Sequence, residues 1–120
     1  MGNFRELKVW RLSKQLAVDV YQITGCQKIA RDNSLCDQLR RAAVSVPSNI
    51  AEGDERYSDK EAIRFFYIAK GSLAELATQL EIGVAVGLID HDKATPLLNK
   101  IESLGKMLGK LISSRKQKEA

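Results

Sequence analysis

The segment QLRRAAVSVPSNIAEG, residues 38–53, constrains the fold of this chain more than any other part of the sequence. Its apolar residues recur at steps of three and four, which places them on one face of a helix. These residues are Leu39, Ala42, Val46 and Ile50. A polar stripe with nearly the same spacing runs beside them and consists of Arg41, Ser45, Asn49 and Glu52. Pro47 removes one backbone donor within the pattern, so we expect the helix to bend there.

Helical periodicity accounts for most of the remaining sequence, and no strand-like alternation is sustained. We expect four helices, over about residues 7–23, 34–52, 59–86 and 92–112. The last helix has a strict heptad seam of Leu97, Ile101, Leu104, Leu108 and Leu111. Short connections make neighbouring helices antiparallel, so the sequence predicts an all-α, up-down-up-down four-helix bundle. This single domain would span residues 1–112, and residues 113–120 would form a basic C-terminal tail that frays.

Capping signals mark three of the helix starts. Ser58 with Glu61 is a capping box at the third helix, and Ser34 with Asp37 has the same spacing at the second. The candidate caps of the fourth helix are Asp92 and Thr95.

The third predicted helix is rich in small residues, which let another helix approach closely at some cost in helix propensity. These are Ala69, Gly71, Ser72, Ala74, Ala77 and Gly83. The pattern favours self-association, although a monomeric bundle can also use such a groove.

Composition excludes several classes of protein. A chain of 120 residues favours one domain with a sizeable core. Cys26 and Cys36 are too few for a disulfide framework and are read as ordinary thiols of a reducing cytoplasm. Residues 1–10 lack the apolar region of a signal peptide, and no apolar run is long enough to span a membrane, so we expect no signal peptide and a cytoplasmic protein.

Signals of catalysis are poor. His91 is the only histidine and falls in a predicted loop without a serine or cysteine partner. No phosphate-binding loop, HExxH or EF-hand pattern occurs. Glu52 and Glu75 lie on different predicted helices, but a di-metal bundle site needs Glu-x-x-His pairs, which are absent. We therefore expect no catalytic residue, no metal and no cofactor, and a protein that is not an enzyme.

Three runs of this sequence resemble a known family. They are FRELKVWRLSKQLAVDVY near the start, QLRRAAVSVPSNIAEG followed by Arg56, and FFYIAKGSLAELATQL leading to VGLID. Their order and spacing, from about Phe4 to Ile112, are similar to those of bacterial four-helix-bundle proteins encoded within intervening sequences of large-subunit ribosomal RNA genes. The middle run is the specific part of the resemblance.

The resemblance implies a four-helix bundle that assembles as a homo-oligomer, typically a ring of five. It also implies a fold like that of the accessory variability protein of diversity-generating retroelements, a basic pentamer that works with a reverse transcriptase and nucleic acid. The net charge of this chain, +4, is modest beside that of the retroelement proteins, so their role does not transfer directly.

The basic residues indicate a function more clearly than any catalytic pattern does. The charge balance is +4 over residues 1–49, −4 over residues 50–95 and +4 over residues 96–120. This layout permits a basic patch or complementary faces that meet between subunits. A ring would repeat each patch around one axis and permit multivalent contact with phosphates. The candidate nucleic-acid contacts are Arg11, Lys14, Arg40, Arg41, Arg56 and Arg64.

Two functions remain open at this point. The first is a non-enzymatic accessory or scaffold protein that binds structured RNA or another nucleic acid. The alternative is a protein-interaction module, for instance for a nucleic-acid-processing enzyme, with no direct nucleic-acid role. The low aromatic content, mostly at predicted core positions, does not indicate base stacking.

The polar stripe also has two interpretations. Ser45, Asn49 and Glu52 could form a hydrogen-bond network with Ser72 and Glu75 that fixes helix register. They could instead form a binding surface. The variant Asn49→Leu would impair folding or assembly in the first case only.

Overall fold

The computed structural model describes residues 2–119, and this part of the chain contains helices joined by short connections and no strand. The expectation of an all-α fold is confirmed. After a 3-10 turn, η1 at Phe4–Glu6, the helices are α1 (Lys8–Thr24), α2 (Gln27–Ala30), α3 (Asn33–Asp54), α4 (Asp59–Ala85) and α5 (His91–Glu119). The turn η1 and the short α2 were not predicted. α3 runs without interruption through Pro47.

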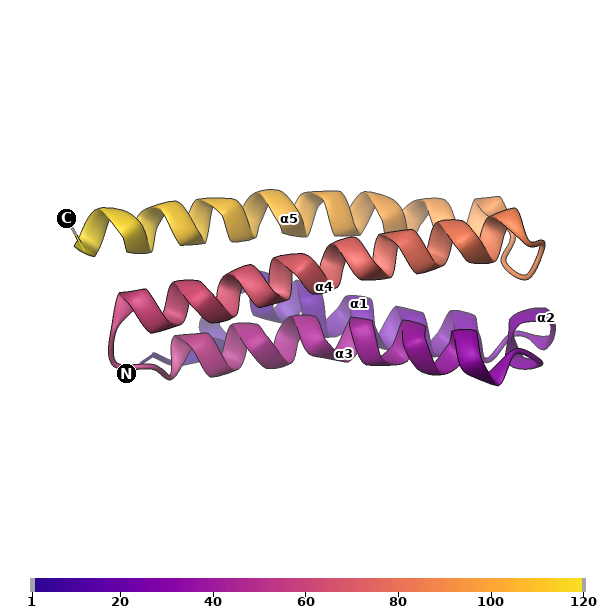
Figure 1. The fold of residues 1–120 in the computed structure, drawn as a ribbon, viewed down its shortest axis with the longest axis horizontal. Coiled ribbons are helices and arrows are strands. Elements are labelled where there is room, and N and C mark those ends of the chain that lie inside the picture. Colours follow the sequence, from indigo (N-terminus) through magenta and orange to yellow (C-terminus); the bar gives the residue numbers. More distant parts are fainter. Residues whose placement is uncertain (1, 120) are drawn as a thin grey trace.

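The four long helices lie along one axis in a bundle of 49 × 20 × 18 Å (Figure 1). α1 packs against α3 and α5, and α4 packs against the same two helices, which gives a four-sided arrangement. The turn between α3 and α4 lies at one end of the bundle. The α2 segment and the loop between α4 and α5 lie at the other end (Figure 1).

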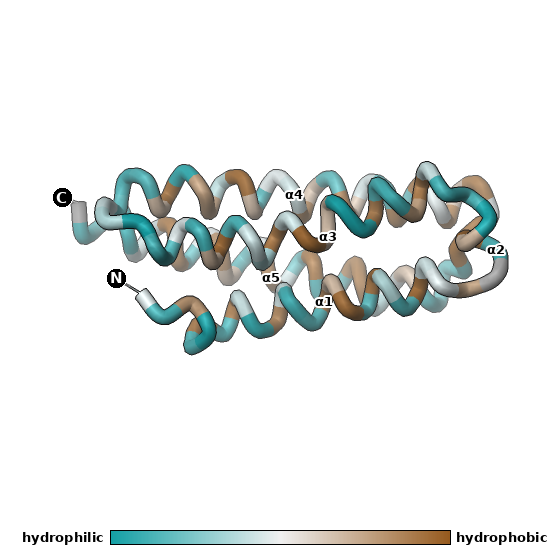
Figure 2. The backbone as a smooth tube through the Cα atoms, turned by 90° about the horizontal axis from the view of Figure 1, so that it is seen from below, coloured by the Kyte–Doolittle hydropathy of each residue, from teal (hydrophilic) through white to brown (hydrophobic). Residues whose placement is uncertain are grey.

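Apolar residues at helical spacing form one continuous core. Leu39, Val46 and Ile50, from the segment that constrains the fold, are fully buried. Hydrophobic and hydrophilic residues alternate along each long helix, as expected where one face packs inward (Figure 2). In α5 the predicted heptad seam is wrong at its last position, because Ile112 is buried and Leu111 is only partly buried. A straight α-helix has 3.6 residues per turn, whereas a strict heptad repeat needs 3.5. The step of four residues from Leu108 therefore brings Ile112, and not Leu111, to the core.

Helix ends follow from local capping. Ser58 Oγ accepts the backbone N–H of Glu61 at 3.1 Å, so the predicted cap of α4 is confirmed. The predicted cap of α3 is wrong: Asp32, two residues before Ser34, is the N-cap and accepts the N–H of Leu35 at 2.9 Å. α4 ends in a Schellman motif at Gly87, whose φ of +79° favours glycine.

The predicted frayed tail at residues 113–120 is not what the structure contains over residues 113–119, which continue α5. Ala120 lies outside the described residues. α5 also begins earlier than predicted, at His91, so Pro96 is inside the helix rather than at its first position. A reason for the longer helix lies in the contacts of Arg115, described below.

Candidate nucleic-acid interface

Both ends of the chain and the turn between α3 and α4 lie at the same end of the bundle (Figure 1). We call it the basic end and define it as residues 2–14, 50–64 and 108–119. By sequence it carries eleven Lys or Arg and seven Asp or Glu, a balance of +4. The rest, residues 15–49 and 65–107, carries eight of each and has no net charge. The whole formal net charge of the chain is therefore gathered at one end.

The start of α1 contributes Arg11 and Lys14 to the basic end. Arg11 Nη1 donates to the backbone carbonyls of Arg5 at 3.2 Å and Glu6 at 2.9 Å, which holds it against the preceding turn. Lys14 Nζ lies 5.6 Å from the centroid of the Trp10 ring. Both cationic side chains remain exposed, so their charge is available to an anionic partner.

The turn between α3 and α4 contributes Arg56, and the first turns of α4 contribute Lys60 and Arg64. The Arg56 guanidinium lies 4.6 Å from the centroid of the Phe65 ring. Lys60 and Arg64 are exposed and form no ion pair within residues 2–119. The expectation that most aromatic residues lie in the core is wrong, because Phe66 alone among the seven is buried. Tyr57, in this turn, is 93% exposed.

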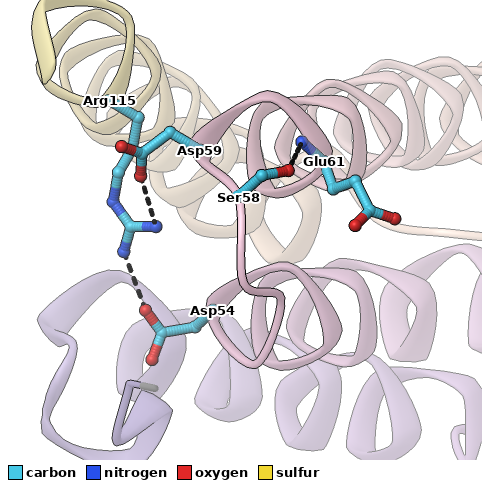
Figure 3. Close-up of polar contacts among 5 residues, drawn as sticks. All are labelled: Asp54, Ser58, Asp59, Glu61 and Arg115. Carbon is cyan, nitrogen blue, oxygen red and sulfur yellow. Dashed lines mark hydrogen bonds and ion pairs between the residues drawn. The ribbon is translucent and has the colours of Figure 1, made fainter. Parts of the chain in front are cut away.

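A buried ion pair closes the basic end. Arg115 Nη2 on α5 donates to Asp54 Oδ1 at 2.8 Å, and Arg115 Nη1 lies 3.6 Å from Asp59 Oδ1 (Figure 3). The guanidinium also lies 5.4 Å from the centroid of the buried Phe66 ring. One side chain thus ties the end of α5 to the end of α3 and the start of α4. Because Arg115 falls in the tail predicted to fray, sequence reasoning missed it.

Arg40 and Arg41 lie outside the basic end and on different flanks of α3. Arg40 Nε donates to Thr24 Oγ1 at 2.9 Å, and its guanidinium lies 4.8 Å from the centroid of the Tyr21 ring, on the α1 side. Arg41 Nε pairs with Asp37 Oδ2 at 2.9 Å on an exposed surface. Four of the six predicted contacts therefore lie at the basic end, namely Arg11, Lys14, Arg56 and Arg64. Arg40 and Arg41 are separated from them and from each other.

The polar stripe divides into a network and a solvated part. Asn49 Nδ2 donates to Ser45 Oγ at 2.9 Å, Ser45 Oγ lies 2.9 Å from Ser72 Oγ, and Ser72 Oγ donates to the carbonyl of Ile68 at 3.1 Å. This hydrogen-bonded chain links α3 to α4, as the first interpretation of the stripe expects. Glu52 is outside it.

Glu52 of the polar stripe and Glu75, its expected network partner on α4, both face solvent. Glu52 Oε2 lies 3.8 Å from Arg56 Nη2, one helical turn along α3. Glu75 is exposed and borders a shallow groove between α3 and α4 that Arg41 and Ser45 also line. These carboxylates therefore do not share a site.

One exposed face runs along α4 and onto Val86, the residue that caps its end. We call it the outer face of α4 and define it as Ile68, Gly71, Ala74, Thr78, Ile82 and Val86; the exposed Glu75 lies on the same side of the helix, one turn after Gly71. Ile68, Ile82 and Val86 are 44%, 49% and 62% exposed. A Cβ added to Gly71 would meet nothing within 4 Å, so the protomer itself does not require glycine there. Such a face is available to another helix.

The described residues offer little for other chemistry. No three His, Cys, Asp or Glu side chains gather as metal ligands would within residues 2–119. No described helix is long and apolar enough to cross a membrane. Burial raises the pKa of the Cys36 thiol, which the nearby Arg40 charge opposes only in part.

These features define the chain as a small all-helical bundle whose net positive charge is gathered at one end, where α1 and α4 begin and α3 and α5 end (Figure 1). The family model described as 23S rRNA-intervening sequence protein matches residues 5–110. The chain therefore belongs to this family, and the resemblance seen in the three sequence runs is confirmed.

One solved structure supports the fold independently. It is the crystal structure of a protein with unknown function from the S23 ribosomal protein family of Bacteroides thetaiotaomicron, which matches with a TM-score of 0.80. The two chains are 21% identical, and the match covers 87% of this chain and 97% of that chain. At this identity the likeness supports the fold alone. A comparison with curated proteins found no match.

Proposed function

We propose that this protein is a non-enzymatic, cytoplasmic accessory or scaffold protein that binds structured RNA through its basic end. The observation that carries the proposal is the concentration of the whole net charge at one end of the bundle. Phosphates are the natural partner of exposed arginine and lysine, and their contacts supply most of the affinity for nucleic acid. The chain belongs to a family whose name refers to intervening sequences of 23S rRNA, and this membership is consistent with an RNA partner.

The proposal includes self-assembly of the antiparallel up-down-up-down bundle, with a ring of five as the state that the resemblance implies. The outer face of α4 supports assembly, because it leaves Ile68, Ile82 and Val86 exposed around the small residues Gly71 and Ala74. Contiguous exposed apolar surface is typical of protein interfaces. A ring would place copies of the basic end around one axis and raise the local potential.

The outer face of α4 also favours the second candidate function, a module that captures a partner protein. In that case the partner rather than a second copy covers Ile68 and Ile82, and the basic end is incidental. The two functions differ in salt dependence, since counterion release acts on phosphate contacts and has little effect on an apolar interface.

The test is fluorescence anisotropy with a labelled ribosomal RNA hairpin and a random-sequence duplex over a salt series. Light scattering fixes the oligomeric state at the protein concentration used. Tight binding that weakens by orders of magnitude with modest salt supports the proposal. Absence of binding to either RNA at low salt would contradict it and favour the protein-interaction module.

A further inference from the structure

Tyr57 is the most exposed large apolar or aromatic side chain of the described chain. It lies in the four-residue turn between α3 and α4, residues 55–58, at the basic end, and is 93% exposed. Isolated exposed apolar residues are normal and need no explanation alone. Tyr57 differs from them because of the charges around it and the rigidity of the turn that carries it.

Cationic side chains flank Tyr57 on both sides in the chain. Arg56 precedes it, and Lys60 and Arg64 follow on the first turns of α4. The nearby carboxylates of Asp54 and Asp59 both face the Arg115 guanidinium. Three exposed carboxylates remain beside the turn, those of Glu52, Glu55 and Glu61, and Glu52 pairs with Arg56 at 3.8 Å. The turn therefore combines an open aromatic ring with two exposed cations, Lys60 and Arg64, that form no ion pair with the described residues.

The turn that presents Tyr57 is held at both of its ends (Figure 3). On the α3 side, a Cβ added to Gly53 would lie 2.8 Å from the Phe66 ring, so the backbone packs closely on α4. On the α4 side, Ser58 caps the helix through the N–H of Glu61. Little backbone freedom remains to be lost when a ligand binds, which favours affinity.

We propose that Tyr57 stacks on an unpaired base of an RNA whose phosphates are held by Arg56, Lys60 and Arg64. This inference rests on the proposed function and narrows its partner to RNA with unpaired nucleotides. In a duplex the bases are already stacked on one another, so an open ring can stack only on a base in a loop, bulge or end. Base–aromatic stacking is tolerant of sequence, so the preference is for unpaired bases and not for one sequence.

The test compares a fluorescein-labelled RNA hairpin that has an unpaired loop with a fully paired RNA duplex of equal nucleotide number. Anisotropy is measured for the full chain and for the variants Tyr57→Ala, Tyr57→Phe and Tyr21→Ala. Tyr21 is the matched control, because its ring is 49% exposed but lies outside the basic end. Because Tyr57 is 93% exposed, its replacement should leave the packing of the bundle intact, so the Tyr57 variants are expected to fold.

We expect Tyr57→Ala to weaken hairpin binding about tenfold, with the duplex affinity unchanged. Tyr57→Phe keeps the ring and should bind the hairpin like the parent chain, as should Tyr21→Ala. Equal hairpin affinities of Tyr57→Ala and the parent chain would overturn the inference, and so would an equal loss in Tyr21→Ala. Salt-dependent duplex binding would in that case still support the proposed function, whereas no binding to either RNA would overturn both.

Discussion

Arg115, near the end of α5, neutralises the carboxylate of Asp54, near the end of α3, across 61 positions of sequence at a distance of 2.8 Å. The Asp54 side chain is 4% exposed and that of Arg115 is 17% exposed. Asp54 Oδ2 has no hydrogen-bond partner within the described chain, so its charge depends on the pair through Oδ1. A buried carboxylate without its cation is costly, because its charge has been taken out of water without compensation.

The first prediction follows from this pair. Arg115→Met should lower the free energy of unfolding by about 2 kcal/mol or more, because Asp54 would be left buried without its cation. Urea denaturation followed by circular dichroism measures the change. In the double variant Asp54→Asn/Arg115→Met the loss should be smaller than the sum of the two single losses.

Lys118→Met is the matched control for charge, since Lys118 is exposed on the same last turns of α5. It should change stability by less than about 0.5 kcal/mol. An Arg115→Met variant as stable as Lys118→Met would mean that the ion pair contributes nothing to the stability of the fold.

The second prediction concerns Gly71 on the outer face of α4. Gly71→Ala should raise the stability of an isolated protomer by about 0.5–1 kcal/mol, because alanine is the better helix former and the added methyl group meets open space. In the assembly the same methyl group should hinder the approach of a neighbour. Sedimentation at several concentrations should therefore detect weaker association.

Gly109→Ala is the control for that experiment. Gly109 lies on α5, and a Cβ added there also meets nothing within 4 Å. The variant should gain similar stability without any change in association. Stronger or unchanged association of Gly71→Ala would exclude this face from the interface.

Local and periodic features of the fold could be predicted from sequence. The three- and four-residue steps of Leu39, Val46 and Ile50 identified buried positions, because a helix that packs on one side must repeat them. Ser58 was recognised as a cap because its partner Glu61 is only three residues away. Asp32 was not, because the neighbouring Ser34 offers a competing pattern.

The candidate site could be predicted only in part, because it is assembled from three separate segments. Charge counted along the chain alternates in sign, and only the fold brings residues 2–14, 50–64 and 108–119 to one end. Arg11, Arg56 and Arg64 were identified individually. Arg115 was overlooked because the polar composition of its segment resembles a disordered tail and Asp54 is distant in sequence.

The third prediction concerns the chain of hydrogen bonds from Asn49 through Ser45 to Ser72. Ser45→Ala should lower stability by about 1 kcal/mol, because the buried Ser72 hydroxyl and the partly buried Asn49 amide lose their shared partner and keep only one backbone hydrogen bond each. Adding Ser72→Ala should cost little more, since the network is already broken. Asn49→Leu should also impair folding or assembly. Ser48→Ala, at an exposed neighbour, is the control in thermal denaturation and should be close to neutral.

The fourth prediction compares charges inside and outside the basic end. Arg64→Glu should weaken RNA binding several-fold at low salt and reduce the slope of log affinity against log salt by about 1, as expected for one lost phosphate contact. Arg41→Glu makes the same charge change where the surface has no net charge. The prediction that Arg40 and Arg41 also contact nucleic acid is tested by the same comparison. Equal losses for Arg64→Glu and Arg41→Glu would mean that contacts extend along α3.

The fifth prediction concerns the two thiols. Cys36 is buried, its Sγ lies 3.1 Å from the carbonyl oxygen of Ile29, and burial raises its pKa above the ordinary value of 9.0. The folded protein therefore holds the Cys36 proton more tightly than the unfolded chain does. The corresponding stability is present below pH 9 and is lost as pH rises through the folded pKa.

A disulfide reagent such as Ellman's reagent should consequently label Cys26, which is partly exposed, much faster than Cys36 in the native protein. Cys36 should react only at the rate at which the bundle opens. In urea the two thiols should react equally fast. The variants Cys26→Ser and Cys36→Ser assign the two phases. Rapid labelling of Cys36 in Cys26→Ser under native conditions would mean that α3 separates from α2 readily, and that the end of the bundle opposite the basic end opens on its own.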